Sequence, residues 1–416
     1  MKRVPRITST IDGQHGRTPL RRDTQQWVYD YLIQQTNKTY HWMGDGPGNL
    51  PKSVRSHAMI SKHLGRQAQL VEVFAETELA AGHRESALEL YFDAAHLFSR
   101  AQHPIFELNE EKKFLYAGLR RCYDQVCALS PYRIEKVEVP WNGTLLTGFL
   151  HHCPGVAKAP LLLKLGGCDV TQETDPHPSS NLAHRRGMHL FTLDGPGQGQ
   201  SNMRGIRLTG DNFAPATSAV LDYLTKRPEI DADRIGMLGN GGGSIWGMRV
   251  IAEDHRIKAA ATSSTYTDPF HWMDVEVPRW KQLFAFLTQS TSEQELDKVM
   301  EAMQVSGHMS KITCPTLMVS GEYDLRDPIE EVYRVFDELK VPAELWVFAD
   351  QFHLTSLAAG GTEMVHALMI DWVKDRLEGK PVAHPGQVLY LDKNGAGPNS
   401  PTVPVKRRWY ERATQK

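Results

Sequence analysis

The stretch Arg234-Ile235-Gly236-Met237-Leu238-Gly239-Asn240-Gly241-Gly242-Gly243-Ser244 decides the fold. Its first half is a short apolar run of the kind that is buried on both faces in a parallel sheet. Its second half is a cluster of glycines, after which a helical pattern begins near Ile245. A strand that passes through a tight turn straight into a helix is the repeating unit of a sheet covered by helices.

Further apolar runs alternate with helical stretches on both sides of this unit. They lie at 161–165, 190–193, 259–262, 316–319 and 345–348. The order strand–helix–strand predicts a mostly parallel, doubly wound α/β sheet. Ahead of it, apolar residues alternate around Asn142-Gly143, which predicts a β-hairpin.

The rest of the chain divides around this core. Residues 1–130 are predicted to form an N-terminal helical domain, residues 131–380 the core, and residues 381–416 a loose tail with a strand-like segment at 388–391. A helix is expected at 24–35. A helical insert at about 268–310 is expected to form part of a cap. One helical face is marked by residues at three and four spacing: Ala87, Leu88, Tyr91, Ala94, Ala95 and Phe98.

Composition excludes several classes of function. The net charge is −2 with both signs mixed along the chain, which argues against a nucleic-acid or membrane-surface protein. No long apolar stretch follows the N-terminus, so neither a signal peptide nor a membrane span is expected. The five cysteines are scattered, which favours a reduced, cytoplasmic location. The 18 histidines lack metal-site spacing, and we expect neither a metal nor a cofactor.

Ligands of open parallel sheets bind at the carboxyl ends of the strands, so the residues after each apolar run are the candidates. After the first run come Gly166-Gly167-Cys168-Asp169. Paired glycines let backbone N–H groups face a developing oxyanion, although a plain tight turn is an equal alternative. After the second comes Asp194-Gly195-Pro196-Gly197-Gln198-Gly199, which fits no phosphate-binding spacing and is interpreted as a structural loop.

The glycine turn itself matches the context of a G-x-S-x-G nucleophile elbow. Gly239 and Gly243 fit the two flanking glycines, so Gly241 falls at the nucleophile position. Ser244 lies three residues further, in the first helical turn, and cannot reach the same point without a change of register.

Two later junctions supply an acid and a base. Asp324 follows one predicted strand and His353 follows the next. The chain order nucleophile, acid, histidine is that of α/β hydrolases. Asp324 would orient the imidazole of His353, and His353 would act as general base and acid. Asp327 competes with Asp324 for the role of the acid, because an Asp after a strand is also common as a helix cap.

At this point the core, about 130–378, resembles the α/β-hydrolase family of the bacterial dihydroxypseudooxynicotine hydrolase and the fungal hydrolases that shorten polyketide pigment precursors. The likeness is carried by the motif 166–169 through Glu173, by the motif 194–199, and by an Ala-Gly-His-Arg stretch at 81–84. It implies cofactor-free cleavage of esters or of carbon–carbon bonds beside a carbonyl. It also implies an oxyanion hole from the backbone of Cys168 and Gly242, and a helper carboxylate at Glu173. A serine is implied at 241, where this chain has glycine.

Three accounts of Gly241 follow. The chain is a hydrolase with its nucleophile removed, or an enzyme that uses His353 and Glu173 without serine for a hydrolytic, lyase or cyclising reaction, or a non-catalytic binding protein. The retained acid–base pair favours the first two. We expect a small apolar or aromatic ligand in contact with Gly167, Trp272 and Trp280, with core packing as the alternative for the aromatic residues of the insert, Phe284 and Phe286 included. We further expect the helical region 56–129 to contribute pocket walls, and a homodimer is left open.

Overall fold

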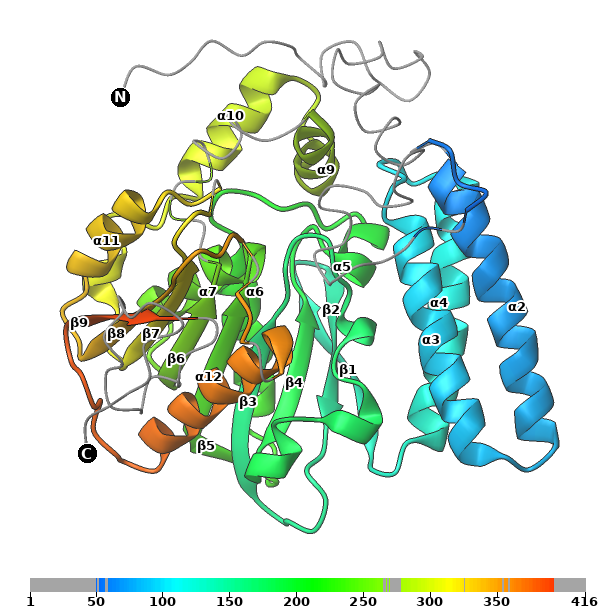
Figure 1. Ribbon diagram of the computed structural model, residues 1–416, viewed down its shortest axis with the longest axis horizontal. Coiled ribbons are helices and arrows are strands. Elements are labelled where there is room, and N and C mark those ends of the chain that lie inside the picture. The colour runs from blue at the N-terminus through cyan, green and yellow to red at the C-terminus, as the bar shows by residue number, and fades with distance from the viewer. Residues whose placement is uncertain are drawn as a thin grey trace, which may run out of the picture.

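A computed structural model describes residues 50–392, except 51, 57–58, 265–266, 268, 270–277, 325, 354 and 358–359. A nine-stranded sheet forms its centre, in the order β1-β2-β4-β3-β5-β6-β7-β8-β9 (Figure 1). Strands β3 to β9 are parallel, and β2 pairs antiparallel with both β1 and β4. The bounds are β1 Ile134–Trp141, β2 Thr144–His151, β3 Ala159–Leu165, β4 His189–Asp194, β5 Ile230–Asn240, β6 Ile257–Ser263, β7 Thr316–Gly321, β8 Ala343–Phe348 and β9 Gln387–Leu391.

Every predicted strand is present, and the predicted doubly wound sheet is confirmed. The hairpin turn between β1 and β2 has positive φ at both central residues, 47° at Asn142 and 76° at Gly143. This is the turn type that Asn-Gly favours, because its twist matches that of the flanking strands.

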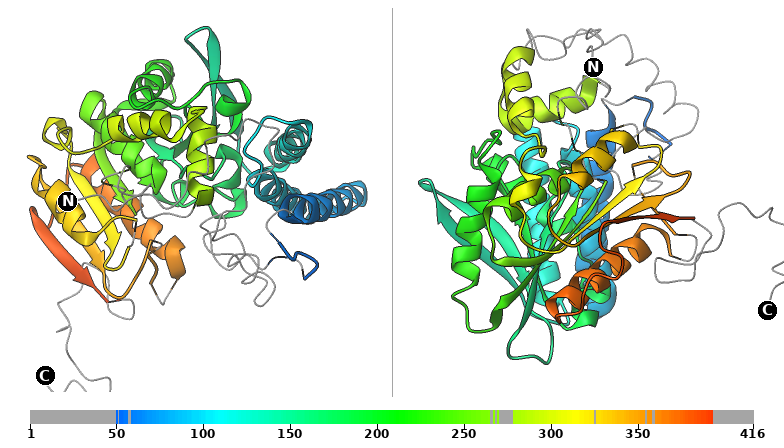
Figure 2. Two further views of the ribbon diagram at one scale, coloured as in Figure 1. Left: turned by 90° about the horizontal axis from the view of Figure 1, so that it is seen from above. Right: turned by 90° about the vertical axis from the view of Figure 1, so that its left-hand side faces the viewer.

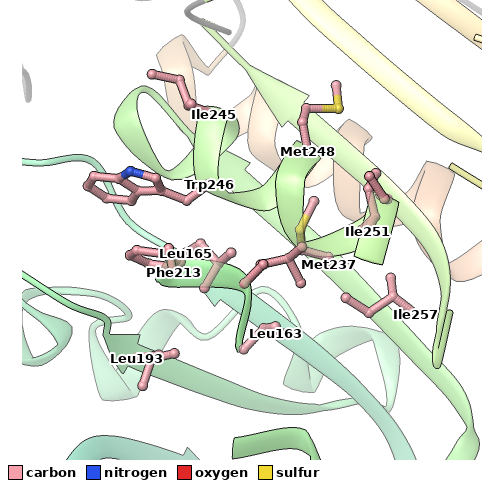
Figure 3. Packing of buried hydrophobic residues seen from close by; sticks show 14 of the residues in the cluster. Leu163, Leu165, Leu193, Phe213, Met237, Ile245, Trp246, Met248, Ile251 and Ile257 are labelled. Atoms are coloured by element: carbon pink, nitrogen blue, oxygen red, sulfur yellow. The ribbon is translucent and has the colours of Figure 1, made fainter. Parts of the chain in front are cut away.

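One face of the sheet is closely packed by helices. Helices α6 (Phe213–Leu224), α7 (Gly242–Glu253) and α11 (Ile329–Asp337) cover it, and strand residues such as Leu163, Leu165 and Met237 point into this layer (Figure 3). The rings of Phe213 and Trp246 stack at 4.5 Å and 11° within it.

The opposite face is covered differently. Helix α12 (Gly361–Leu377) packs on β5 and β6, but no α-helix stands between β3 and β4. The connection instead forms three 3-10 turns: η2 (Gln172–Thr174), η3 (Pro178–Ser180) and η4 (His184–Arg186). Part of the sheet beside α12 therefore lacks a covering helix.

The predicted helical domain consists of α2 (Ile60–Ala80), α3 (Arg84–Gln102) and α4 (Glu110–Leu129). The residues of the predicted helical face are all buried in its core. It stands beside the β1–β2 side of the sheet (Figures 1 and 2), where Tyr123 packs edge-on against Phe149 of β2 at 4.8 Å.

The insert contains α9 (Pro278–Thr288) and α10 (Glu293–Ala302), which lie above the carboxyl ends of the strands (Figure 1). The short elements α5 (Gly199–Met203) and η5 (Met309–Lys311) also lie within the described residues. The helix predicted at 24–35 and the tail beyond 392 lie outside the described residues. Among the described helices, none combines the length and the apolar character that crossing a membrane would need.

Candidate active site

A cavity of about 510 Å³ lies at the carboxyl ends of β3 and β5 and runs along the sheet beneath α12. Several candidates from the sequence line it, namely Gly167, Cys168, Gly241, Gly242 and His353. Residues far apart in the chain thus meet at one edge of the sheet, as expected for a doubly wound fold.

Gly241 forms a sharp turn between β5 and α7. Its φ is 54° and its ψ is −121°, and its N–H donates to the carbonyl of Ser263 at 3.0 Å. A side chain is strained in this conformation, which is the strain that a nucleophile elbow carries. The position expected for the nucleophile therefore has elbow geometry and lines the cavity.

Ser244 is held away from this point. Its hydroxyl donates to the carbonyl of Gly241 at 2.5 Å inside the first turn of α7. The side chain is fully buried and does not line the cavity. Ser244 therefore does not stand in for the absent serine.

Asp324 and His353 lie in hydrogen-bond contact, with 2.8 Å between Asp324 Oδ2 and His353 Nδ1. Burial by itself raises the pKa of Asp324, but the charge and hydrogen bond of His353 and the N–H of Arg326 bring that pKa below its ordinary value. The ionised carboxylate accepts from Nδ1, so Nε2 is the nitrogen that transfers protons.

Asp327 has a different environment. Its carboxyl oxygen accepts from the N–H of Thr267 at 2.9 Å and from the Thr267 hydroxyl at 2.5 Å. Full burial raises the pKa of Asp327 well above its ordinary value, and its contacts are with Thr267 rather than with the histidine. The geometry favours Asp324 over Asp327 as the partner of the histidine.

Cys168 and Gly242 approach each other closely at the cavity. A Cβ added to Gly242 would lie 3.0 Å from the Cys168 nitrogen, which is tighter than an ordinary contact, so glycine suits this position. Two backbone segments that converge beside residue 241 have the arrangement that an oxyanion hole needs. The assignment of these two N–H groups stays a prediction.

The structure does not bring Glu173 to the cavity. Its carboxylate is fully buried on the other side of η2 and pairs with Arg120 of α4, at 2.7 Å between Oε1 and Nη1. A residue that fastens the helical domain to the core fits these contacts better than a helper carboxylate does. The sequence spacing did not show which way this side chain points.

Asp169 is an acidic residue at the cavity to which the sequence alone assigned no role of its own. It lines the cavity, and its pKa is raised by burial and lowered in part by the positive charges of Arg326 and His353. It directly follows the Gly166-Gly167-Cys168 motif, and that adjacency was the signal that could have identified it.

The helical domain does not form walls of this cavity, contrary to expectation, since no described residue of 59–129 lines it. Instead, Lys112 and Tyr116 reach the loop 168–171 from behind. The reason is that η2 lies between the helices and the cavity. Of the aromatic candidates, Trp272 and the side chain of Trp280 lie outside the described residues, while Phe284 is buried in the core and Phe286 packs against Phe106.

One group of side chains in the described part of the chain has metal-type spacing: Glu135, His152 and Glu229. The guanidinium of Arg227 already donates to both carboxylates at 2.7 to 2.8 Å, so their charge is compensated. None of the three lines the cavity, and we assign no metal to them.

The sheet order, the elbow and the acid–histidine pair define an α/β hydrolase. The esterase FrsA-like family model matches residues 66–278, and the prolyl oligopeptidase family model matches residues 179–380. The chain therefore belongs to the FrsA-like esterase family.

Individual relatives agree with this membership. The 2,6-dihydropseudooxynicotine hydrolase of Paenarthrobacter nicotinovorans is 31% identical over 319 residues, which cover 74% of this chain and 82% of that protein. The 20-hydroxy-prefusarin hydrolase of Gibberella moniliformis is 27% identical over 61% of this chain and 71% of its own. The crystal structure of the 2,6-dihydroxy-pseudo-oxynicotine hydrolase superposes with a TM-score of 0.70 at 26% identity, covering 87% of this chain and 99% of that one.

Proposed function

We propose that this protein is built to cleave, without a cofactor, a carbon–carbon bond beside a ketone or an ester bond in a small aromatic or polyketide-like molecule. We further propose that Gly241 stands at the nucleophile position, so that the chain as written is strongly impaired. The observation that carries both statements is the elbow backbone of Gly241 at the cavity that also holds the His353–Asp324 pair.

With a serine at 241, the geometry supports acyl transfer. His353 Nε2 takes the hydroxyl proton while the serine oxygen attacks the substrate carbonyl, and Asp324 stabilises the charged imidazole. The backbone at Cys168 and Gly242 faces the oxygen that becomes negative. Collapse breaks the bond to the leaving carbon or oxygen, which receives the proton from His353, and water then releases the acyl group by the same steps.

With glycine at 241, the first of these steps has no attacking atom. Loss of the nucleophile from a triad lowers turnover by about a million-fold and leaves only the contribution of the oxyanion hole and binding. Glycine suits the positive φ, so the fold tolerates the change.

A second candidate has one specific observation in its favour. Asp169 lies within the electrostatic reach of His353 and Arg326, and burial raises its pKa. A raised pKa suits a carboxyl group that donates a proton. His353 and Asp169 would then form a general base and acid that act directly on water or substrate, in a serine-free lyase, cyclase or hydrolase.

The two candidates make opposite predictions for Gly241→Ser. For a disabled hydrolase, the serine variant gains several powers of ten in kcat/KM on 4-nitrophenyl butyrate or 1-phenylbutane-1,3-dione. It also becomes covalently labelled by a fluorophosphonate. For a serine-free enzyme, the hydroxyl crowds the site, and the rate of the unaltered chain falls.

Gly241→Ala is the matched control, because it adds the same backbone strain without a hydroxyl. It should show neither labelling nor a gain in rate. A serine variant that folds but is neither labelled nor faster contradicts the disabled-hydrolase proposal.

A further inference from the structure

The cavity continues as a channel along the strands, away from the reacting edge. Its floor contains Gly166, just after β3, and then Lys164 and Leu162 of β3, in order from the edge inward. On β4, Thr192 lies in register with Lys164, and Leu190 lies in register with Leu162. Because four residues of extended chain span about 13 Å, the channel has a mouth at the edge of the sheet and an inner end about 13 Å away, at the level of Leu162.

Helix α12 forms the roof of the channel. His366 lies near the mouth, because its Nε2 is 3.3 Å from the amide nitrogen of Asn240, the residue before Gly241. Val373 lies at the far end, where it packs so closely on β5 that a Cβ on Gly236 would be 2.4 Å from its Cγ1. Ile370 lies between these two positions, on the same face of the helix as His366, and lines the channel. It therefore covers the inner part of the channel.

The inner end of the channel is apolar. Leu162, Leu190 and Ile370 come together there, and Leu182 and Ala183 of the connection between β3 and β4 close the side. These side chains carry no hydrogen-bonding group, so a polar group of a ligand would lose its hydrogen bonds to water without replacing them. An alkyl chain loses none and is favoured by the same surroundings.

The carboxyl groups that line the channel all lie ahead of its apolar end: Asp169, Asp175, Asp194 and Glu363. Asp194 is the last residue of β4, and Asp169 follows the glycines after β3, so both belong to the mouth. Glu363 is exposed in the first turn of α12. Asp175 pairs with the ammonium of Lys164 and compensates its charge. Charged groups therefore surround the mouth and the middle of the channel, but not its inner end.

We infer that this channel binds a linear alkyl or acyl chain of the substrate, attached to the carbonyl that reacts at position 241. The inference rests on the proposed function, because it places the reacting carbonyl at the mouth, beside Gly241 and His353. A depth of about 13 Å corresponds to about ten bonds of an extended chain. The substrate class is then a ketone or ester with an unbranched chain of medium length, and Leu162 and Ile370 set the longest chain that fits.

The test measures binding of unbranched methyl ketones to the chain as written, by isothermal titration calorimetry at pH 7. The series is pentan-2-one, heptan-2-one, nonan-2-one and undecan-2-one, whose members differ only in chain length. We expect Kd to fall about ten-fold for each added pair of methylenes, because each methylene that enters the channel leaves water.

Two neighbouring residues of α12 provide a variant and its matched control. Ile370→Phe fills the inner end, so the gain in affinity should stop after heptan-2-one. Met369→Phe introduces the same side chain on the same helix, but Met369 is buried and does not line the channel, so the whole series should be kept. Circular dichroism and Tm establish that both variants fold.

A Kd that does not change with chain length, absence of saturable binding by all four ketones, or an undiminished series in Ile370→Phe would each overturn the inference. An equal loss in Met369→Phe would do the same, because the effect would not then be specific to the channel. If Ile370→Phe does not fold, Ala183→Leu fills the same end and takes its place, with the same expected result. Labelling of Gly241→Ser by a small fluorophosphonate does not need a long chain, so failure of the hydrolase proposal and failure of this inference are separate results.

Discussion

The same strands form both faces of the central sheet, but one face is closely packed and the other borders a cavity. On one face, α6, α7 and α11 form a continuous core with strand residues such as Leu163 (Figure 3). On the other, α12 and three 3-10 turns cover the sheet and leave a cavity of about 510 Å³ over Leu162 and Lys164. Adjacent residues of one strand thus belong to a structural and a functional surface, because side chains alternate across a sheet.

The largest effect is expected at the reacting end of the cavity face. In a Gly241→Ser background, Asp324→Asn should lower kcat about 10⁴-fold, because the amide no longer selects the correct tautomer of His353. Asp327→Asn is the control. Asp327 contacts Thr267 and not His353, so kcat should stay within a few-fold. A larger loss in the Asp327 variant than in the Asp324 variant would reverse the assignment of the acid.

The segment between β3 and β4 separates the cavity from the helical domain, and the ion pair between Arg120 and Glu173 joins this segment to the domain. A variant of Arg120 measures what the ion pair contributes to stability. Arg120→Met should lower the free energy of unfolding by about 3–5 kcal/mol, because it leaves the buried Glu173 carboxylate without its cation. Glu173→Gln should cost less, since the guanidinium of Arg120 that remains still pairs with Asp124 at 3.3 Å and reaches solvent in part.

A variant of the same ion pair distinguishes a structural role of Glu173 from a catalytic role. In the Gly241→Ser background, kcat of Glu173→Gln should remain within a few-fold of its parent. A hundred-fold loss of kcat with unchanged urea unfolding would show that Glu173 takes part in catalysis.

A pair of neighbouring leucines compares the two faces directly. Leu163→Ala should destabilise the protein by about 3–5 kcal/mol, because it opens a void in a closely packed layer. Leu162→Ala, on the cavity side, should cost about 2 kcal/mol, since its side chain already borders open space. Urea unfolding at pH 7 measures both, and equal costs would mean that the two faces are packed alike.

The smallest effect concerns the pH dependence of stability on the cavity face. The pKa of His366 is about 3 in the folded protein and about 6.5 unfolded, so the unfolded chain binds more protons as the pH falls below about 6.5. Stability is therefore lost on acidification, by up to about 2 kcal/mol between pH 7 and pH 5 from this residue. His366→Gln should remove that share of the slope in unfolding free energy, and an unchanged slope would mean that the ring is solvated.

The histidine of this last prediction was not singled out from the sequence, whereas the proposed triad positions were predicted from it. Gly241, Asp324 and His353 each follow a strand, and their order along the chain matches the order nucleophile, acid and base of α/β hydrolases. His366 lies within a helix, and only the packing of α12 over β5 brings it beside Asn240. Helical spacing shows which residues share a face, but it does not show what that face contacts.

The sequence by itself determined the strands, the Asn-Gly hairpin, the helical face from Ala87 to Phe98 and the elbow at Gly241. These features depend on patterns within a few residues, either a period of 2 or 3.6 or the special backbone freedom of glycine. Only the tertiary structure decided that Glu173 faces Arg120, that Asp169 faces the cavity, and that Asp324 pairs with His353 while Asp327 pairs with Thr267. The direction of each of these side chains depends on segments far away in the chain, because a buried polar group takes whichever partner packing places within hydrogen-bond distance.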